Sequence, residues 1–293
     1  MATPTLTIDS TVKLPSGHDM PRLGFGVYQT PANEAARCVT DAFDAGYRHI
    51  DSAAAYRNES ACGDGIRAAS IPRSDIFFTS KIPPKKMGYE TTKAQVDESL
   101  AKSGLNYIDL ILLHSPYGGS AKRKGSWKAL VEAVEAGKVR SIGISNYGVH
   151  HLDELEQYIA ELEAERGGKG KGGVISVLQS EIHPYCPRND VVAWCASRGI
   201  AVEAYAPLVQ GQRWGEKGTK ALAEKYGKTE AQVLIRWSLQ RGLVPLPKSV
   251  TTGRIQENAD VYDFELTPEE VAGLETIEYS PVCWDPNVAP LDA

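Results

Sequence analysis

Short apolar segments alternate with longer amphipathic segments along most of the chain. The apolar segments have the length of buried strands, and each is followed by a stretch whose apolar residues recur at the spacing of a helix. In one such stretch Trp127, Leu130, Val131 and Val134 fall on one helical face, and Gly137 follows where a C-terminal glycine cap is expected. The pattern therefore predicts an α/β protein in which strands and helices alternate.

Eight of the apolar segments are predicted to be strands. They span residues 22–28, 47–51, 76–82, 107–115, 139–145, 174–182, 200–208 and 243–249. Strict alternation of strand and helix favours a parallel sheet with right-handed crossovers. Eight such units in 293 residues match a (β/α)8 TIM barrel in number and size.

Further elements are expected outside the eight repeats. Residues 5–9 and 11–17 read as an N-terminal β-hairpin, and Thr267 and Pro268 are typical of the N-cap and first residue of an extra C-terminal helix. A Pro-rich loop follows from Ser280, and the glycine-rich residues 166–173 form a flexible surface connector. No domain boundary is visible, so residues 1–293 are predicted to be a single barrel domain.

Composition and charge narrow the range of partners. The net charge is −5 and no long basic block occurs, which argues against nucleic acid and membrane partners. The first residues lack the features of a signal peptide, and no apolar run has transmembrane length. The five cysteines are scattered without metal-binding spacing. We therefore expect a cytoplasmic protein without a metal, as a monomer or a weak dimer.

Polar side chains stand at the ends of three consecutive predicted strands. Asp51, Lys81 and His114 end these strands, and Tyr56 follows Asp51 closely. Each side chain alone has an ordinary structural explanation, such as a helix cap, a lysine reaching solvent or a hydrogen-bonded histidine. In a barrel of this kind, however, the carboxyl ends of the strands carry the functional groups. Four polar groups at one mouth therefore indicate a site.

The residues around these four side chains resemble the aldo-keto reductase family. HIDSAAAYRNE, FFTSKI and LLHSP are similar to its active-site blocks, and MPRLGFGVYQ, GKVRSIGISNY, LQSEIHPYC, YAPL and VPLPKSVTTGRIQEN agree in the same order. The resemblance covers nearly the whole chain. It implies a (β/α)8 barrel that reduces the carbonyl group of a small aldehyde or ketone with a nicotinamide cofactor, usually NADPH.

The resemblance implies a catalytic role for each of the four groups. Carbonyl reduction requires a hydride at carbon and a proton at oxygen, and Tyr56 is the expected proton donor. A free phenol has a pKa of about 10, and we expect a neighbouring Lys81 ammonium to lower it by up to about three units. Asp51 is expected to keep Lys81 charged, and His114 to orient the substrate oxygen.

Cofactor binding is expected without a Rossmann domain, because no Gly-rich strand–turn–helix fingerprint with its acidic partner occurs. The resemblance instead implies an extended cofactor, NADPH or NADP+, across the barrel mouth. The matching positions are Ser145, Asn146 and Gln179 for the carboxamide, Tyr205 for stacking on the nicotinamide, Lys248, Ser249 and Arg254 for the phosphate, and Glu257 and Asn258 for the adenine. Val27, Tyr28, Asp51, Pro207 and Leu208 are further predicted cofactor contacts. For Tyr205 the alternative is a structural aromatic at the barrel rim.

The substrate pocket is predicted to contain Tyr28, Pro83, Ser115 and Trp284. Ser115 stands where many family members have tryptophan, so we expect a wider and less aromatic pocket. Trp284, in the irregular tail, is expected to close the pocket from above. The sequence does not identify the natural substrate.

Three other interpretations of the sequence are possible. Tyr89 and Lys93 match the YxxxK of short-chain dehydrogenases, but they stand at a helix start in a chain without the Gly-rich turn. His49 and Asp51 are too few for the metal site of a barrel hydrolase. A non-catalytic cofactor-binding or regulatory member on the same barrel remains the alternative.

Overall fold

A computed structural model describes residues 6–293, and eight parallel strands form one sheet within this part of the chain. The strands are β3 (Phe25–Gly26), β4 (His49–Asp51), β5 (Phe77–Ile82), β6 (Ile108–Leu113), β7 (Val139–Ser145), β8 (Val177–Glu181), β9 (Ala201–Tyr205) and β10 (Val244–Leu246), in sequential order. The two edge strands of the sheet, β3 and β10, are joined by hydrogen bonds. The backbone N–H groups of Gly24 and Gly26 donate to the carbonyls of Pro245 and Pro247 at 3.1 and 3.0 Å. The predicted barrel is thus confirmed.

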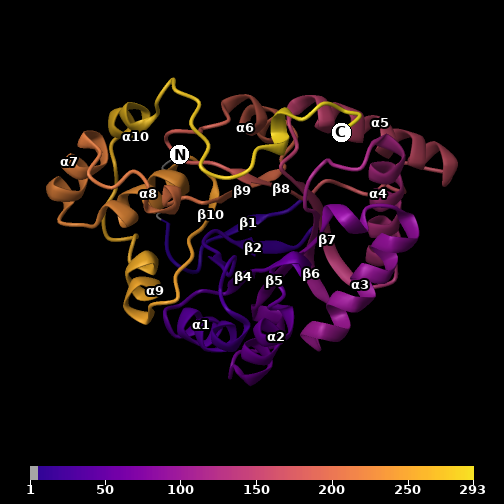
Figure 1. Cartoon of the computed structure of the whole chain (residues 1–293), viewed down its shortest axis with the longest axis horizontal. Coiled ribbons are helices and arrows are strands. Elements are labelled where there is room, and N and C mark those ends of the chain that lie inside the picture. The colour runs from indigo at the N-terminus through magenta and orange to yellow at the C-terminus, as the bar shows by residue number, and fades with distance from the viewer. Residues whose placement is uncertain (1–5) are drawn as a thin grey trace.

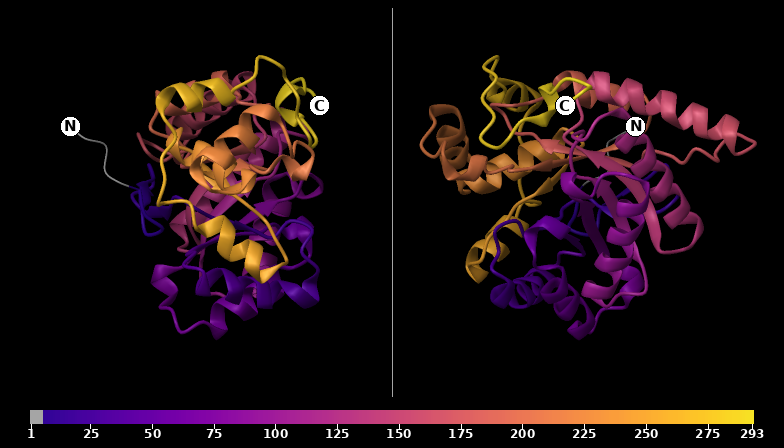
Figure 2. Two further views of the ribbon diagram at one scale, coloured as in Figure 1. Left: turned by 90° about the vertical axis from the view of Figure 1, so that its left-hand side faces the viewer. Right: turned by 45° about the vertical axis from the view of Figure 1, so that its right-hand side comes forward.

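Helices surround the strands (Figures 1 and 2). They are α1 (Ala32–Asp44), α2 (Glu59–Ala68), α3 (Tyr89–Ser103), α4 (Ser120–Glu135), α5 (Val149–Glu165), α6 (Asn189–Ala196), α7 (Lys217–Tyr226), α8 (Glu230–Gln240), α9 (Thr252–Ala259) and α10 (Pro268–Leu274). One α-helix follows each strand from β3 to β8. Two follow β9, namely α7 and α8, and two follow β10, namely α9 and the extra α10.

Two local signals that predicted helix ends are seen in the structure. In α4 the predicted face is buried at Trp127 and Leu130, and Gly137 beyond its end has a positive φ of 71°. In α10 the side chain of Thr267 accepts a hydrogen bond from the backbone N–H of Glu270 at 3.2 Å, and Pro268 is the first helical residue. The extra C-terminal helix is therefore confirmed with its cap.

The N-terminal hairpin differs from the prediction in its register. Within the described residues it pairs β1 (Thr11–Lys13) with β2 (Asp19–Pro21), not residues 5–9 with 11–17, and residue 5 lies outside the described part. The reason is a tight turn at Gly17, which has a φ of 88° and whose N–H donates to the Leu14 carbonyl at 2.9 Å.

The hairpin closes one end of the barrel. Its Leu14 and Met20 are buried together with inward-facing strand residues, among them Leu110, Leu112 and Val177. This apolar cluster fills the barrel at the amino ends of the strands. The C-terminal segment after α10, yellow in Figure 1, crosses over the strands in this view. No helix between residues 6 and 293 combines the length and apolar character needed to span a membrane.

Candidate active site

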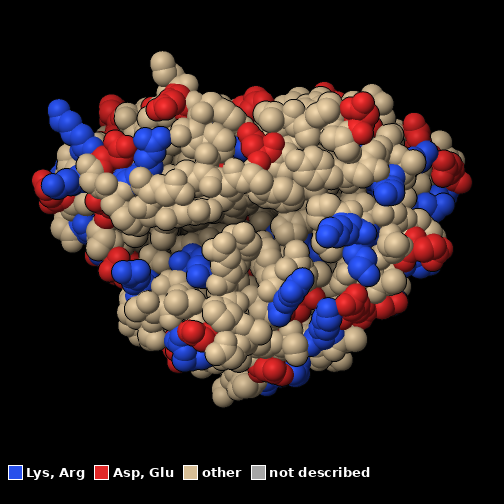
Figure 3. Space-filling model, in the orientation of Figure 1, with Lys and Arg blue, Asp and Glu red and all other residues tan. Residues whose placement is uncertain are grey.

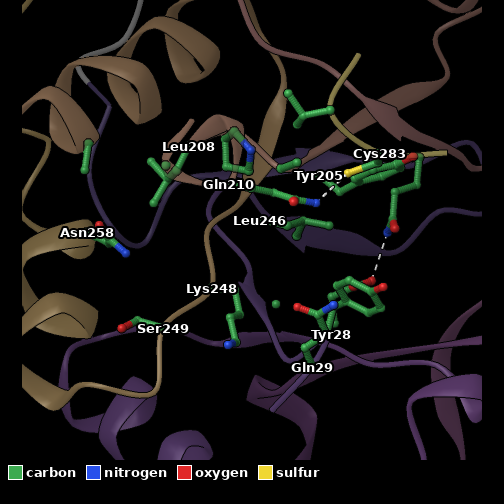
Figure 4. Close-up of a pocket in the computed structure, with 18 of the residues that line it drawn as sticks. Tyr28, Gln29, Tyr205, Leu208, Gln210, Leu246, Lys248, Ser249, Asn258 and Cys283 are labelled. Carbon is green, nitrogen blue, oxygen red and sulfur yellow. Dashed lines mark hydrogen bonds between the residues drawn. The ribbon is translucent and has the colours of Figure 1, made fainter. Parts of the chain in front are cut away.

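A cavity of about 1300 Å³ opens at the carboxyl ends of the strands. The space-filling view shows this face hollowed across its middle, with mostly uncharged residues at the border (Figure 3). In the close-up, Lys248, Ser249 and Asn258 lie toward one end of the cavity, and Tyr28 and Tyr205 toward the other (Figure 4). The cavity therefore joins residues from both ends of the chain, from Gly26 to Trp284.

A buried ion pair lies below the floor of this cavity. Lys81, at the end of β5, donates from Nζ to both carboxylate oxygens of Asp51 at 2.7 and 2.8 Å and to the Ser52 carbonyl at 2.8 Å. Lys81 is only 1% exposed and Asp51 4%. The same Nζ lies 3.5 Å from the hydroxyl oxygen of Tyr56, so a cation is held directly behind that phenol.

Tyr56 itself reaches the cavity from the 3-10 turn Ala54–Tyr56. Its pKa is raised well above the ordinary value, first because burial disfavours the phenolate and second because the Asp51 carboxylate repels it. The expected lowering by Lys81 is therefore wrong for this state of the protein. The Asp51 carboxylate that pairs with Lys81 at 2.7 Å opposes the effect of the ammonium on the phenol, and burial of the ring adds to the rise. Tyr56 is a protonated phenol at neutral pH.

The His114 imidazole stands beside this phenol, with ring centroids 5.7 Å apart. Burial, and secondarily the Lys81 charge, lower the pKa of His114 to about 3, so the ring is neutral at physiological pH. Trp284 from the C-terminal segment packs edge-on against His114 at 6.0 Å, and Tyr28 lies 5.1 Å from the Tyr56 ring. Both aromatic side chains line the cavity, as expected for a substrate pocket.

Two side-chain amides line the cavity beside these groups. Asn146 donates from Nδ2 to the His114 carbonyl at 3.0 Å and to Ser145 Oγ at 3.1 Å, and its Oδ1 accepts from the Tyr205 hydroxyl at 2.8 Å. Gln179 donates from Nε2 to Asp51 at 2.8 Å and to Glu203 at 2.6 Å. In this cluster the Gln179 amide oxygen is left to accept from a ligand amide, and the Ser145 hydroxyl, which accepts from Asn146, is left to donate to it.

The other end of the cavity carries two cations. Lys248 and Arg254 flank Ser249 at the carboxyl end of β10 and the start of α9, and all three line the cavity. Neither cation forms a salt bridge or a side-chain hydrogen bond with the described residues. Unpaired cations beside a helix N-terminus are suited to a phosphate group. The cavity wall nearby also includes Pro207, Leu208, Glu257 and Asn258.

Comparison with known proteins places this geometry in a family. The model described as "Aldo/keto reductase family" matches residues 22–278. The chain belongs to the aldo/keto reductase family. It is 41% identical to the glyoxal reductase of Bacillus subtilis over 92% of this chain and 94% of that protein. It is 43% identical to an uncharacterized oxidoreductase of Schizosaccharomyces pombe over 97% of this chain and 100% of the relative.

A solved structure agrees with the same assignment. The crystal structure of an aldo-keto reductase from Bombyx mori in complex with NADP superposes with a TM-score of 0.83 and 31% identity. The match covers 95% of this chain and 96% of that one. The aldo/keto reductase fold expected from the sequence is thus confirmed, and the relatives are oxidoreductases.

Four predicted site residues lie outside the lining of the cavity in this aldo/keto reductase. Lys81 and Val27 are buried beneath it, where Lys81 still touches Tyr56. Ser115, two residues beyond the end of β6, is fully buried and is not part of the cavity lining, so the expectation that it lines the substrate pocket is corrected. Pro83 also lies outside the lining, which includes its neighbour Pro84 at the start of the 3-10 turn Pro84–Lys86.

Three residues of the site were not predicted from the sequence. Asn58 holds two loops together: its Nδ2 donates to the carbonyls of Val27 and Thr30 at 2.9 and 3.1 Å. Gln210 donates to Cys283 Sγ at 3.0 Å, which links the loop after β9 to the C-terminal segment across the cavity (Figure 4). Glu203 is an acid inside a barrel strand, and its inward parity with Tyr205 was a signal that could have found it.

The residues on which a short-chain dehydrogenase motif or a metal site would depend do not line the cavity as such a site. Tyr89 and Lys93 lie on the first turn of α3, outside the cavity, and Tyr89 donates to Glu132 at 2.6 Å. His49 is fully buried in the barrel and its Nε2 lies 3.1 Å from Thr79 Oγ1. Over residues 6–293, no three His, Cys, Asp or Glu side chains are grouped in a way that could hold a metal ion.

Proposed function

We propose that this aldo/keto reductase reduces a small aldehyde or ketone to an alcohol with NADPH, and that Tyr56 donates the proton. The observation that carries the proposal is the Tyr56 hydroxyl in the cavity, 3.5 Å from Nζ of the buried Lys81. A structural lysine would need no phenol at that position. The glyoxal reductase among the relatives supports carbonyl reduction, and the NADP complex of the Bombyx mori relative supports the cofactor.

The residues present fit a nicotinamide dinucleotide phosphate. At one end, Gln179 has an open amide oxygen beside Ser145, which suits a primary carboxamide. At the other end, the two unpaired cations Lys248 and Arg254 suit the additional phosphate. Tyr205 would flank the nicotinamide ring, and Glu257 and Asn258 the adenine. One continuous cavity of about 1300 Å³ joins the two ends, which is the space that an extended cofactor and a small substrate need.

The chemistry then follows from the protonation states of the protein groups. When bound, the reduced nicotinamide supplies a hydride to the carbonyl carbon. Tyr56 donates its phenolic proton to the carbonyl oxygen, which completes the alcohol. The Lys81 ammonium stabilises the phenolate that this transfer leaves, and Asp51 holds Lys81 in place. Neutral His114 is able to donate a hydrogen bond that orients the carbonyl oxygen toward Tyr56, and Tyr28 and Trp284 bound the substrate side.

The proposal is tested by an oxidation assay. The purified protein is incubated with NADPH or NADH and a panel of aldehydes, α-keto esters, diketones and sugars, and the loss of absorbance of the reduced cofactor is recorded. We expect turnover of at least one carbonyl class, faster with NADPH. Tight NADPH binding without turnover of any substrate would instead favour the non-catalytic alternative, and absence of binding would contradict both.

A further inference from the structure

The Gln179 amide is held between two carboxylates inside the barrel. Its Nε2 donates to Asp51 Oδ2 at 2.8 Å and to Glu203 Oε2 at 2.6 Å. Gln179 and Glu203 are direct neighbours in the register of β8 and β9. An amide nitrogen carries two hydrogens, and one carboxyl oxygen of Asp51 and one of Glu203 each accept one of them, so both donors of Gln179 are satisfied. With the hydrogen bond to Asp51 alone, the amide group of Gln179 would be able to rotate. The second hydrogen bond, to Glu203, fixes the plane of the amide.

Glu203 is hard to explain as a stabilising residue. It is fully buried, its Oε1 has no hydrogen bond within the described residues, and the nearest basic group to that oxygen is His49 Nε2 at 3.4 Å. An acid in such a place costs stability relative to an apolar residue, because its desolvation is compensated by few partners. Burial accordingly raises the pKa of Glu203 to about 8. A destabilising group beside a cavity indicates a functional reason for its presence.

The consequence of this arrangement is an amide oxygen that faces the cavity. Gln179 lines the cavity, and its Oε1 is neither paired with a described residue nor sealed from solvent. The neighbouring Asn146 differs, because its Oδ1 already accepts from Tyr205 and its Nδ2 donates to His114 and Ser145. Gln179 Oε1 is therefore the amide oxygen of this cluster that still lacks a donor.

We propose that Glu203 is a positioning residue that holds Gln179 with its Oε1 toward the cavity, ready to accept an N–H from the carboxamide of the cofactor. This inference rests on the proposed nicotinamide cofactor, and it assigns a role to a residue that would not touch that cofactor. Glu203 acts only through Gln179, whose own position is set by β8.

Two variants of Glu203 separate the effect of its hydrogen bond to Gln179 from the effect of its size. Glu203→Gln keeps an oxygen that is able to accept from Gln179, whereas Glu203→Met keeps the length of the side chain and provides only a weak acceptor. Circular dichroism and thermal melting check that each variant is folded. If Glu203→Met does not fold, Glu203→Thr replaces it, because its hydroxyl is too short to reach Gln179.

Three ligands report on the contact by titration calorimetry. They are NADP+, its 3-acetylpyridine analogue, in which a methyl group replaces the carboxamide nitrogen, and adenosine 2′-monophosphate, which lacks the nicotinamide. We expect the parent protein to prefer NADP+ over the acetylpyridine analogue. Glu203→Met should reduce that preference by about 3- to 10-fold, the value of one hydrogen bond. Glu203→Gln should retain it, and adenosine 2′-monophosphate should bind all three proteins equally.

The outcomes distinguish the inference from the proposed function. Equal weakening of NADP+ and the acetylpyridine analogue in Glu203→Met, or an unchanged preference, would overturn the role of Glu203 and leave the proposed function standing. A parent protein that binds NADP+ no better than the acetylpyridine analogue would also overturn it. A parent protein that binds none of the three ligands would overturn the proposed function and the inference together.

Discussion

The interior of the barrel holds an unusual number of titratable side chains for an apolar environment. Lys81 and Asp51 form an ion pair at 2.7 Å, and His49 Nε2 lies beside them at 3.4 Å from Glu203 Oε1. Burial, the main cause, lowers the pKa of His49 to about 4 and raises that of Glu203 to about 8, so both are uncharged near neutral pH. The site thus carries one buried ion pair surrounded by neutral polar groups.

This burial has a measurable effect on stability. Because the folded pKa of His49 is lowered below the value of about 6.5 for unfolded chains, the unfolded state binds a proton that the folded state does not bind between these two values. The contribution of His49 to stability therefore falls as the pH drops from about 6.5 toward 4. The free energy of unfolding of the parent should fall between pH 7 and pH 5. In His49→Gln this fall should be smaller by about 2 kcal/mol.

Urea denaturation at both pH values measures this difference. The same substitution at the exposed His18 serves as the control for loss of a histidine. If His49→Gln and the parent lost stability in parallel over this range, His49 would not be a buried neutral imidazole.

The elements of the barrel depend on close contact between neighbouring strands. Gly143 lies in the middle of β7, paired with Leu112 on one side and Val177 on the other. A Cβ at this position would lie 2.2 Å from the Val177 carbonyl oxygen and 2.8 Å from Leu112 Cδ2, so a side chain would push the strands apart.

Gly143→Ala should therefore destabilise the protein by about 1–3 kcal/mol, as overpacking does in other cores. Gly273→Ala is the matched control, because that glycine is exposed in helix α10 and a Cβ there meets nothing within 4 Å. The control should be neutral or stabilising by up to about 1 kcal/mol. Denaturant melts of both variants test this, and equal effects of the two substitutions would contradict the packing of β7.

The elements were predictable to different degrees, for physical reasons. All eight strands were found because buried strands are near-continuous apolar runs, and α10 because Thr267 and Pro268 are local signals. The hairpin was misplaced because its register depends on the turn at Gly17 and on packing of Met20 into the barrel, which are not local features of the sequence. The hydrogen bond from Gln210 to Cys283 joins two loops that are 73 positions apart, so no local sequence pattern predicts it.

The site shows the same division. Strand ends placed Asp51, Lys81 and His114 correctly at one mouth, because the barrel topology fixes where those ends meet. The predicted shift of the Tyr56 pKa was wrong in direction. A prediction from Lys81 alone omits the opposite charge of Asp51 and the burial of the ring. The position of Ser115 was not predictable from the strand pattern, because it lies beyond the end of β6, where the path of the loop decides which side chains reach the cavity.

At the scale of the whole molecule, the cavity joins a reactive end near Tyr56 to a cationic end near Arg254. We expect the cationic end to select between NADPH and NADH. Arg254→Ala should weaken NADPH binding at least ~10-fold, because a charge-assisted bond to the phosphate is lost, and should leave NADH almost unaffected. The effect should shrink with added salt.

Fluorescence titration of both cofactors at two salt concentrations measures this selectivity. Arg166→Ala, at the end of α5 beside the glycine-rich connector, is the control for loss of a surface arginine. Equal weakening of NADPH and NADH in Arg254→Ala, or a parent protein that prefers NADH, would contradict a phosphate site at this end of the cavity.

The central claim is that the phenol of Tyr56 is the proton donor, and the most direct measurement is the turnover of Tyr56→Phe with NADPH and a carbonyl substrate. This change removes one hydroxyl and leaves the ring against Tyr28 and His114. We predict that kcat falls by at least ~10² while NADPH affinity stays within about twofold of the parent. Tyr28→Phe, the same change on the neighbouring ring, should cost far less. A Tyr56→Phe enzyme that retained near-parental kcat would contradict the account.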